Sequence, residues 1–261
     1  MHDARVSLPD DDAPASNRLQ RATQLFVFEQ RESDSPYVER VWRTRSEPAD
    51  AFISIAAGNW ELNVTRQRGE AYAAILGPES RASTAAIPDD AEFFGIQFKV
   101  GTFMPSLPLL SVSNGGLVLP GSIDGAFRLH GSAWDLPDYD NAEAFVARLV
   151  CEGLLVRDPV VEAAMLDRPI DLSPRSLQRR MLRVTGLTLG AQRQIERALR
   201  AVELLEHGVS ILETVDVAGY ADQAHLTRSL RRFVGQTPAQ VASSRKAEPV
   251  AFVQDRPLLL V

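Results

Sequence analysis

Residues 219–238 read GYADQAHLTRSLRRFVGQTP, a tight turn followed by an amphipathic helical pattern. In this pattern Gly219 supplies a positive φ angle, Tyr220 fills the angle between two helices, and Asp222 caps the helix that follows. The preceding segment, residues 211–218, carries its apolar side chains at the spacing of a short helix. The stretch therefore predicts a helix-turn-helix whose second helix exposes polar and basic side chains.

The same pattern occurs a second time, 49 residues upstream. Ser173 aligns with Asp222 as an N-cap, and Gly186 aligns with Gly235 as a helix end. The aligned pairs between and just beyond them are Leu177 with Leu226, Arg179 with Arg228, Met181 with Leu230, Val184 with Phe233 and Thr188 with Thr237. Residues 189–205 carry one apolar stripe, which predicts a single long helix that holds the two units at a fixed separation.

Charge is unevenly distributed along the chain, whose net charge is −6. Residues 170–246 contain 12 Lys or Arg against 7 Asp or Glu, a net +5, and the remainder contains 16 against 27, a net −11. A basic segment on an acidic body is the asymmetry expected when one domain meets phosphates and the other does not.

The N-terminal half has the pattern of a β domain. Short apolar runs broken by Gly, Pro, Asn and Asp predict strands at residues 25–28, 38–44, 51–56, 60–65, 71–76 and 93–100. Gly58-Asn59 is predicted to be a hairpin turn between two of them. Helical spacing begins near Asn141, and Asp158-Pro159 is predicted to start a further helix. Strands of this length and spacing favour a small barrel or sandwich.

These patterns divide the chain into four parts. We expect a flexible tail at residues 1–20, a strand-rich domain at 21–155, the paired helical units at 156–246, and a C-terminal tail at 247–261. The last four residues, LLLV, are apolar for a free terminus. We therefore expect the C-terminal tail to pack back on the body, as an extra strand or against the helices.

Residues 219–238 resemble the signature of the AraC/XylS-type transcription regulators, and residues 172–180, LSPRSLQRR, resemble their first recognition helix. The resemblance implies an α+β protein, in which a cupin-like β-barrel or sandwich effector domain precedes an all-α double helix-turn-helix domain. The run FGIQFKVG at residues 94–101 is similar to the strand that closes such effector domains. Two recognition helices would enter successive major grooves on one DNA face.

The resemblance also implies a set of site residues and partners. Amide and guanidinium groups match base edges, and the smaller polar and remaining basic groups suit phosphate oxygens. The expected base contacts are Arg175, Gln178, Arg179, Gln223, His225, Thr227 and Arg228, and the expected phosphate contacts are Ser173, Arg180, Ser229, Arg232 and Thr237. The alternative role for His225 is that of a structural cap rather than a base contact. The expected partners are double-stranded DNA at a promoter or operator, a small-molecule effector, a second copy of the chain, and RNA polymerase if the protein activates.

The first unit departs from the family pattern. Only residues 169–172 separate the helix expected at 158–168 from Ser173, so the first unit is expected to be shortened. That departure leaves an alternative open, in which the protein keeps the fold, has weak or no direct DNA contact, and acts as an interaction protein.

Other function classes find little support in the composition. A metal-dependent cupin enzyme needs clustered histidines and a carboxylate, whereas the four histidines are dispersed at positions 2, 130, 207 and 225, so we expect no catalysis, metal or cofactor. The single cysteine, Cys151, is expected to be a buried small hydrophobe. No apolar run reaches membrane-spanning length and the N-terminus lacks a signal-peptide pattern, which predicts a cytoplasmic protein without membrane contact.

Overall fold

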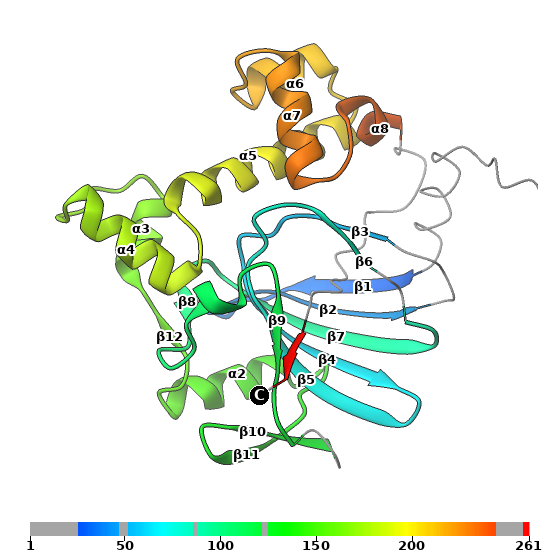
Figure 1. The fold of residues 1–261 in the computed structure, drawn as a ribbon, viewed down its shortest axis with the longest axis vertical. Coiled ribbons are helices and arrows are strands. Elements are labelled where there is room, and N and C mark those ends of the chain that lie inside the picture. Colours follow the sequence, from blue (N-terminus) through cyan, green and yellow to red (C-terminus); the bar gives the residue numbers. More distant parts are fainter. Residues whose placement is uncertain (1–25, 47–51, 86–87, 122–124, 244–257, 261) are drawn as a thin grey trace, which may run out of the picture.

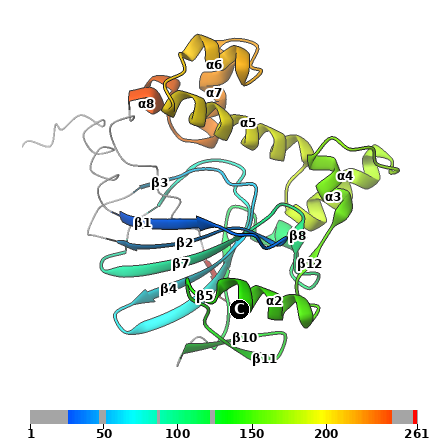
Figure 2. The same ribbon diagram turned by 180° about the vertical axis from the view of Figure 1, so that it is seen from behind.

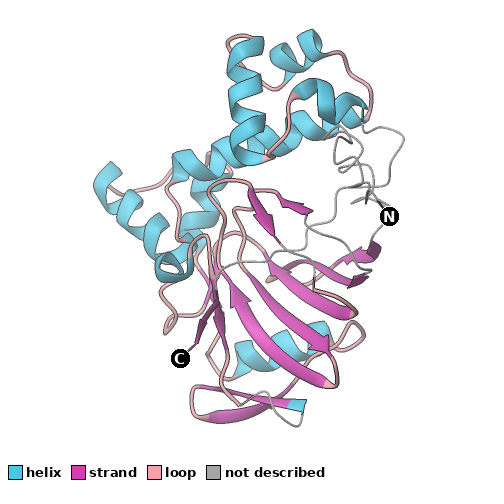
Figure 3. Cartoon of the chain, turned by 45° about the vertical axis from the view of Figure 1, so that its right-hand side comes forward, coloured by secondary structure: helices cyan, strands magenta, loops and turns pink. Residues whose placement is uncertain are grey.

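The computed structural model describes residues 26–46, 52–85, 88–121, 125–243 and 258–260. A strand-rich region extends to Arg157 and a helical region extends from Pro159 to Ser243, as Figure 1 shows. In Figure 3 the helices of the C-terminal region gather at one end of the molecule, away from most of the strands. The predicted α+β class is therefore confirmed, with a sheet-rich N-terminal region followed by a helical region.

One seven-stranded sheet organises the N-terminal region, in the order β1-β2-β7-β4-β5-β9-β13. Its strands are β1 (Phe26–Glu32), β2 (Val38–Ser46), β4 (Glu61–Gln67), β5 (Glu70–Leu76), β7 (Ala91–Phe98), β9 (Gly116–Val118) and β13 (Leu258–Leu260). All neighbours are antiparallel except β13, which pairs in parallel with β9. The described residues of the C-terminal tail, Leu258–Leu260, therefore form the strand at one edge of the sheet. The N-terminal tail lies outside the described residues.

Three two-stranded pairs and one short 3-10 helix complete the N-terminal region. The pairs are β3 (Phe52–Ser54) with β6 (Ser83–Ala85), β8 (Thr102–Phe103) with β12 (Val156–Arg157), and β10 (Ala126–Leu129) with β11 (Ser132–Asp135), and the 3-10 helix is η1 (Leu109–Val112). The hairpin expected at Gly58-Asn59 was wrong. β3 pairs with β6, and β4 pairs with β7 and with β5, so β3 and β4 are not paired with each other. The tight hairpin turn lies instead at Arg68-Gly69, between β4 and β5, where both residues have positive φ.

The main core lies between one face of the large sheet and helix α2 (Ala142–Cys151). The in-register residues Val41, Leu62, Ile75 and Ile96 share that face and are nearly inaccessible to solvent. Val146 and Leu149 of α2 belong to the same cluster, together with Phe127 and Trp134 of the β10-β11 pair. Burial of these alternating side chains accounts for the strand period seen in the sequence. Cys151 is exposed at the end of α2, so its expected burial was wrong.

The opposite face of the sheet is also buried, but it carries polar groups. Glu61, Asn63 and Thr65 of β4 are each no more than 6% exposed. Trp42 lies across Gly95, where an added Cβ would be 2.2 Å from the indole ring, and its Nε1 donates to Glu61 Oε2 at 3.3 Å. The polar and apolar residues of β4 alternate from Glu61 to Thr65, yet both sets are buried, because both faces of the sheet are covered at this strand.

Six helices form the C-terminal region in the described part of the chain. They are α3 (Pro159–Met165), α4 (Pro174–Thr185), α5 (Leu189–Glu206), α6 (Ile211–Val217), α7 (Gln223–Phe233) and α8 (Pro238–Ser243). Figures 1 and 2 both show α3 and α4 at one end of α5 and α6, α7 and α8 at the other. The long connecting helix expected at 189–205 is therefore present and joins two separate helical groups.

The two helical groups repeat the same arrangement. Helices α4 and α7 begin at Pro174 and Gln223, which are 49 positions apart, and α3 and α6 each have seven residues. The expectation of a shortened first unit was therefore wrong. Helix α3 ends at Met165 because Asp167 adopts a φ of 52°, and residues 166–173 provide a longer connection than the second unit has.

Candidate nucleic-acid interface

Helices α4 and α7 each begin at a side-chain cap and expose a polar face. The Ser173 hydroxyl accepts from the N–H of Ser176 at 3.2 Å, and the Asp222 carboxylate accepts from the N–H of His225 at 2.6 Å. Each cap satisfies a backbone donor in the first turn of the helix, where none is available within the helix itself. The first turns of both helices are consequently ordered while their outer faces remain open.

The exposed face of α7 contains most of the expected contacts. Gln223, Arg228 and Arg232 are exposed, whereas Thr227 is half-buried and its hydroxyl donates to the Gln223 carbonyl at 2.8 Å. The buried side of the helix consists of Leu226, Leu230 and Phe233. The period of 3.6 residues places these two sets on opposite sides of α7.

His225 and Ser229 face the connecting helix rather than open solvent. The His225 ring packs edge-on against Tyr220 with centroids 5.1 Å apart, and its Nδ1 accepts a long hydrogen bond from the N–H of Ala221. The hydroxyl groups of Tyr220 and Ser229 are 2.9 Å apart, and burial raises the pKa of Tyr220. These contacts correspond to the structural reading of His225, and its outer edge stays half-exposed.

Helix α4 presents three of the expected base contacts in the same way. Arg175, Gln178 and Arg179 are all exposed. Arg180 turns inward, where its Nε lies 2.7 Å from Oδ2 of Asp158, a buried carboxylate that also caps α3. Of the four basic or amide residues expected to contact DNA from α4, the structure therefore brings three to the surface and ties the fourth, Arg180, to the start of the preceding helix.

Thr237, an expected phosphate contact, lies where α8 begins. Its N–H and hydroxyl both donate to Oε1 of Gln240, and its Oγ1 accepts from the Gln240 N–H at 3.3 Å. This reciprocal arrangement is a capping box. Thr237 thus already has intramolecular partners, although it remains half-exposed.

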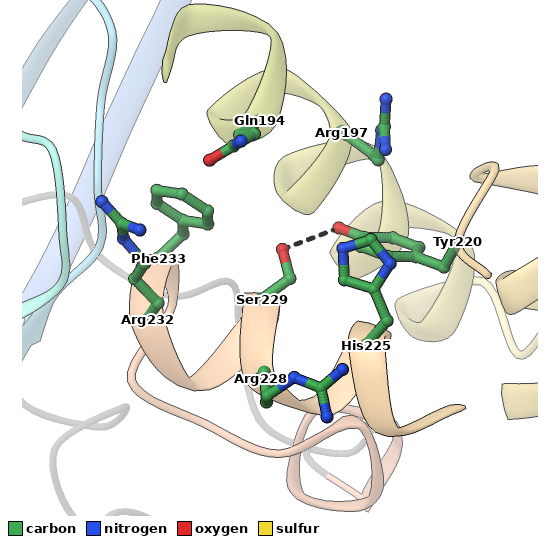
Figure 4. A pocket seen from close by; sticks show the side chains of 8 residues that line it. All are labelled: Gln194, Arg197, Tyr220, His225, Arg228, Ser229, Arg232 and Phe233. Atoms are coloured by element: carbon green, nitrogen blue, oxygen red, sulfur yellow. Dashed lines mark hydrogen bonds between the residues drawn. The ribbon is translucent and has the colours of Figure 1, made fainter. Parts of the chain in front are cut away.

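A pocket of about 180 Å³ opens between α5 and α7. Figure 4 shows the side chains that surround it, which come from both helices and from the turn before α7. The lining residues are Gln194, Arg197, Tyr220, His225, Arg228, Ser229, Arg232 and Phe233. Four of them are expected site residues, but Arg197 lies on α5, outside either recognition helix.

The N-terminal region holds the C-terminal end of α7. The N–H of Ala56 donates to the Phe233 carbonyl at 2.7 Å, and the N–H of Ala82 donates to the Arg232 carbonyl at 2.8 Å. Carbonyl groups in the last turn of a helix have no partner within it, so these bonds act as a cap from another part of the chain. Ile55 and Ala56 also belong to the hydrophobic cluster of the second helical unit.

The C-terminal end of α4 is held in a comparable way. Gly186 ends α4 with a φ of 71°, and the Ser113 hydroxyl, just after η1, donates to its carbonyl at 3.2 Å. An added Cβ on Gly186 would lie 2.7 Å from Ser113 Oγ and 3.0 Å from the Leu109 carbonyl oxygen. Both candidate recognition helices are thus fixed at their C-terminal ends and open at their N-terminal ends.

Sequence patterns gave no signal for several of these residues. Arg197 resembles any exposed arginine on a helix, and the contact of Ser113 with Gly186 spans 73 positions. Pairings over such separations leave no periodicity in the sequence. Within the described residues, no group of three or more His, Cys, Asp or Glu side chains is arranged to hold a metal ion.

Comparison with protein-family models finds a match to a helix-turn-helix domain over residues 168–244. That range contains both capped helices, the connecting helix and α8. Residues 168–244 form an AraC-type helix-turn-helix domain. The AraC-type domain thus covers the second helical unit entirely and the first from its recognition helix onward.

Curated relatives of the AraC-type domain are transcription regulators by name. The chain is 32% identical over 107 residues, 40% of its length, to the HTH-type transcriptional regulator RipA of Corynebacterium diphtheriae. It is 38% identical over 68 residues, 26% of its length, to the protein of the same name from Corynebacterium glutamicum. The matched stretches span 31% and 20% of those two proteins.

Solved structures of ToxT from Vibrio cholerae are also similar to the chain. One matches with a TM-score of 0.40 and 11% sequence identity, over 83% of this chain and 98% of ToxT. A second, with a bound unsaturated fatty acid, matches with a TM-score of 0.34 and 11% identity, over 84% and 95% of the two chains. In the part of this chain that the structure describes, no helix combines the length and apolar character required to cross a membrane.

Proposed function

We propose that the protein is a sequence-specific DNA-binding transcription regulator. The observation that carries the proposal is the pair of capped helices, α4 and α7, which present exposed Arg and Gln side chains from equivalent positions of a repeated unit. Guanidinium and amide groups read base edges in the major groove. The name of the curated relatives and the AraC-type domain agree with this function.

The connecting helix supports binding to one face of a duplex. Helix α5 has 18 residues and spans about 27 Å at 1.5 Å per residue. Successive major grooves on one face of B-DNA recur at roughly 34 Å, a similar distance. A rigid helix of this length would allow both recognition helices to engage the same face.

The proposed contacts are divided between bases and phosphates. The base contacts are Arg175, Gln178 and Arg179 on α4 and Gln223, His225, Thr227 and Arg228 on α7, and the phosphate contacts are Ser173, Arg180, Ser229, Arg232 and Thr237. Arg180 would reach a phosphate through its terminal nitrogens, because Nε is bound to Asp158. His225 would contact a base through the ring edge that faces away from Tyr220.

The N-terminal region is proposed to regulate DNA binding. It contacts the C-terminal ends of both recognition helices through Ala56, Ala82 and Ser113. A change in its conformation would therefore alter how α4 and α7 are held relative to each other. The proposed ligands and partners are an effector molecule, a second copy of the chain and, if the protein is an activator, RNA polymerase.

Selection of bound duplexes from a random pool tests the function. The wild-type protein should enrich one sequence, and Arg228→Ala should lose about 1–3 kcal/mol at its base and relax the preference there. Arg183→Ala is a matched control, because Arg183 is exposed in the last turn of α4, outside the proposed contacts. An unchanged preference in Arg228→Ala would remove that residue from the readout.

The salt dependence of DNA affinity distinguishes the proposed function from the alternative, an interaction protein without direct DNA contact. A protein that contacts phosphates loses affinity steeply as salt rises, because bound counterions are released. Binding to duplex DNA that is absent at low salt would contradict the proposed function. The alternative depended on a shortened first unit, and α3 is as long as α6.

A further inference from the structure

We infer that the pocket between α5 and α7 is an anion site that takes one phosphate group. Its walls carry three guanidinium groups, from Arg197 on α5 and from Arg228 and Arg232 on α7. No lining residue is acidic. Within the described part of the chain, none of the three arginines is within ion-pair distance of a carboxylate.

Uncompensated like charges around one cavity repel each other, and an anion would remove that repulsion. Arg197 is only loosely engaged, with Nη1 3.4 Å from the Gly219 carbonyl oxygen and its guanidinium 5.8 Å from the centre of the Tyr220 ring. Arg232 lies near the Phe233 ring, at 5.0 Å. These side chains can therefore turn toward a ligand without breaking a strong contact.

The chemistry of the pocket favours a phosphate group over other ligands. Guanidinium groups present several N–H donors in a planar fork that matches the oxygens of phosphate. The hydroxyls of Ser229 and Tyr220 lie between the arginines, as Figure 4 shows. They are hydrogen-bonded to each other at 2.9 Å, so one of the two keeps a hydrogen that it would donate to the anion. The aromatic rings of Tyr220 and Phe233 exclude water from part of the wall, which strengthens the attraction.

The proposed source of this phosphate is the DNA backbone, and that part rests on the proposed function. Arg228 lines the pocket and is also a proposed base contact, so the pocket opens directly beside the base-reading face. A backbone phosphate held there would fix the register of α7 on the duplex. Arg197 is then a DNA-positioning residue outside both recognition helices.

The DNA arm of the test compares Arg197→Gln with Arg200→Gln. Both residues are exposed on α5 and both changes remove one positive charge, but only Arg197 lines the pocket. Arg197→Gln should weaken binding of the selected duplex and of a scrambled duplex by the same factor. It should also reduce the slope of log affinity against log salt by about 1, as expected for one lost phosphate contact. Equal slopes in the two variants would show that the phosphate in the pocket does not come from the DNA backbone.

A second arm tests the anion site without DNA. Inorganic phosphate and pyrophosphate, added at constant ionic strength, should raise the melting temperature of the wild type and of Arg200→Gln more than that of Arg197→Gln. This result combined with equal DNA slopes would retain the anion site and assign it to a free phosphorylated molecule. If Arg197→Gln and Arg200→Gln behave alike in both arms, the proposal of an anion site is overturned. Because the second arm needs no DNA, it also separates failure of this site from failure of the proposed function.

Discussion

The side-chain amide of Gln192 donates a 2.8 Å hydrogen bond to the main-chain oxygen of Gly58, 134 positions earlier in the chain. Gln192 lies on α5 and is 1% exposed, and an added Cβ on Gly58 would be 1.9 Å from its Oε1. The bond joins the connecting helix to the N-terminal region at a point where no larger residue fits.

Replacing Gln192 by leucine should lower stability. The Gly58 carbonyl would remain buried without its donor, which costs about 1–3 kcal/mol. Urea unfolding at neutral pH measures this loss. Gln194→Leu, on the exposed side of the same helix, should change stability by less than about 0.5 kcal/mol. Equal stability of the two variants would show that the bond contributes little.

Adding one methyl group to Gly95 should destabilise the sheet. The new Cβ would be 2.2 Å from the Trp42 ring, so the indole must move away from Glu61, at a cost of about 1–3 kcal/mol. Thermal melting measures the change. Gly190→Ala is the matched control, because nothing lies within 4 Å of its Cβ position in α5 and alanine favours helix there. A Gly95→Ala protein that melts at or above the wild-type temperature would contradict the close packing.

Removing Arg180 should destabilise the first helical unit. Asp158 is 3% exposed, accepts from two backbone N–H groups of α3, and is paired with Arg180. Arg180→Met would leave this buried carboxylate without its cation, and because Arg180 is one-third exposed we expect a loss of about 2–3 kcal/mol. Chemical denaturation of Arg180→Met and of the exposed control Arg179→Met measures it. Similar values for both variants would argue against the pairing.

Acid should remove the contribution that the ion pair between Arg31 on β1 and Glu143 on α2 makes to the stability of the fold. Hydrogen bonds from Arg31 lower the pKa of Glu143 from 4.5 to about 2, so the pair stabilises the fold above about pH 4.5. This stabilisation is lost as the pH falls through the folded-state pKa, and solvent screening limits it to about 1 kcal/mol. The stability difference between wild type and Glu143→Gln should therefore shrink from pH 7 to pH 2.5. A difference that is constant over this range would contradict the pair.

Local features of the helical region could be predicted from the sequence. The caps at Ser173 and Asp222, the turn at Gly219 and the long helix α5 all depend on residues within one or two helical turns. The exposed face of α7 followed from the helical period. The end of α3 could not be read in this way, because the left-handed conformation of Asp167 interrupts a stretch that continues to look helical.

Contacts between distant segments could not be predicted. The pairing of β3 with β6 joins residues as far apart as Phe52 and Ala85, whereas the expected hairpin at Gly58-Asn59 followed only the nearest turn signal. The same limit applies to the site. His225 was placed on the correct helix, but its contact with Tyr220, and the pocket shared with Arg197, depend on how α7 packs against α5.

The backbone bonds from Ala56 and Ala82 to the last turn of α7 restrict how this protein can be recombined. A chimera that joined residues 159–244 to an unrelated N-terminal domain would leave the Arg232 and Phe233 carbonyls without these donors, and it would remove Ile55 and Ala56 from the cluster they complete. A chimera that keeps the β3 and β6 segments with the helical region should therefore be more stable than one that carries the helical region alone.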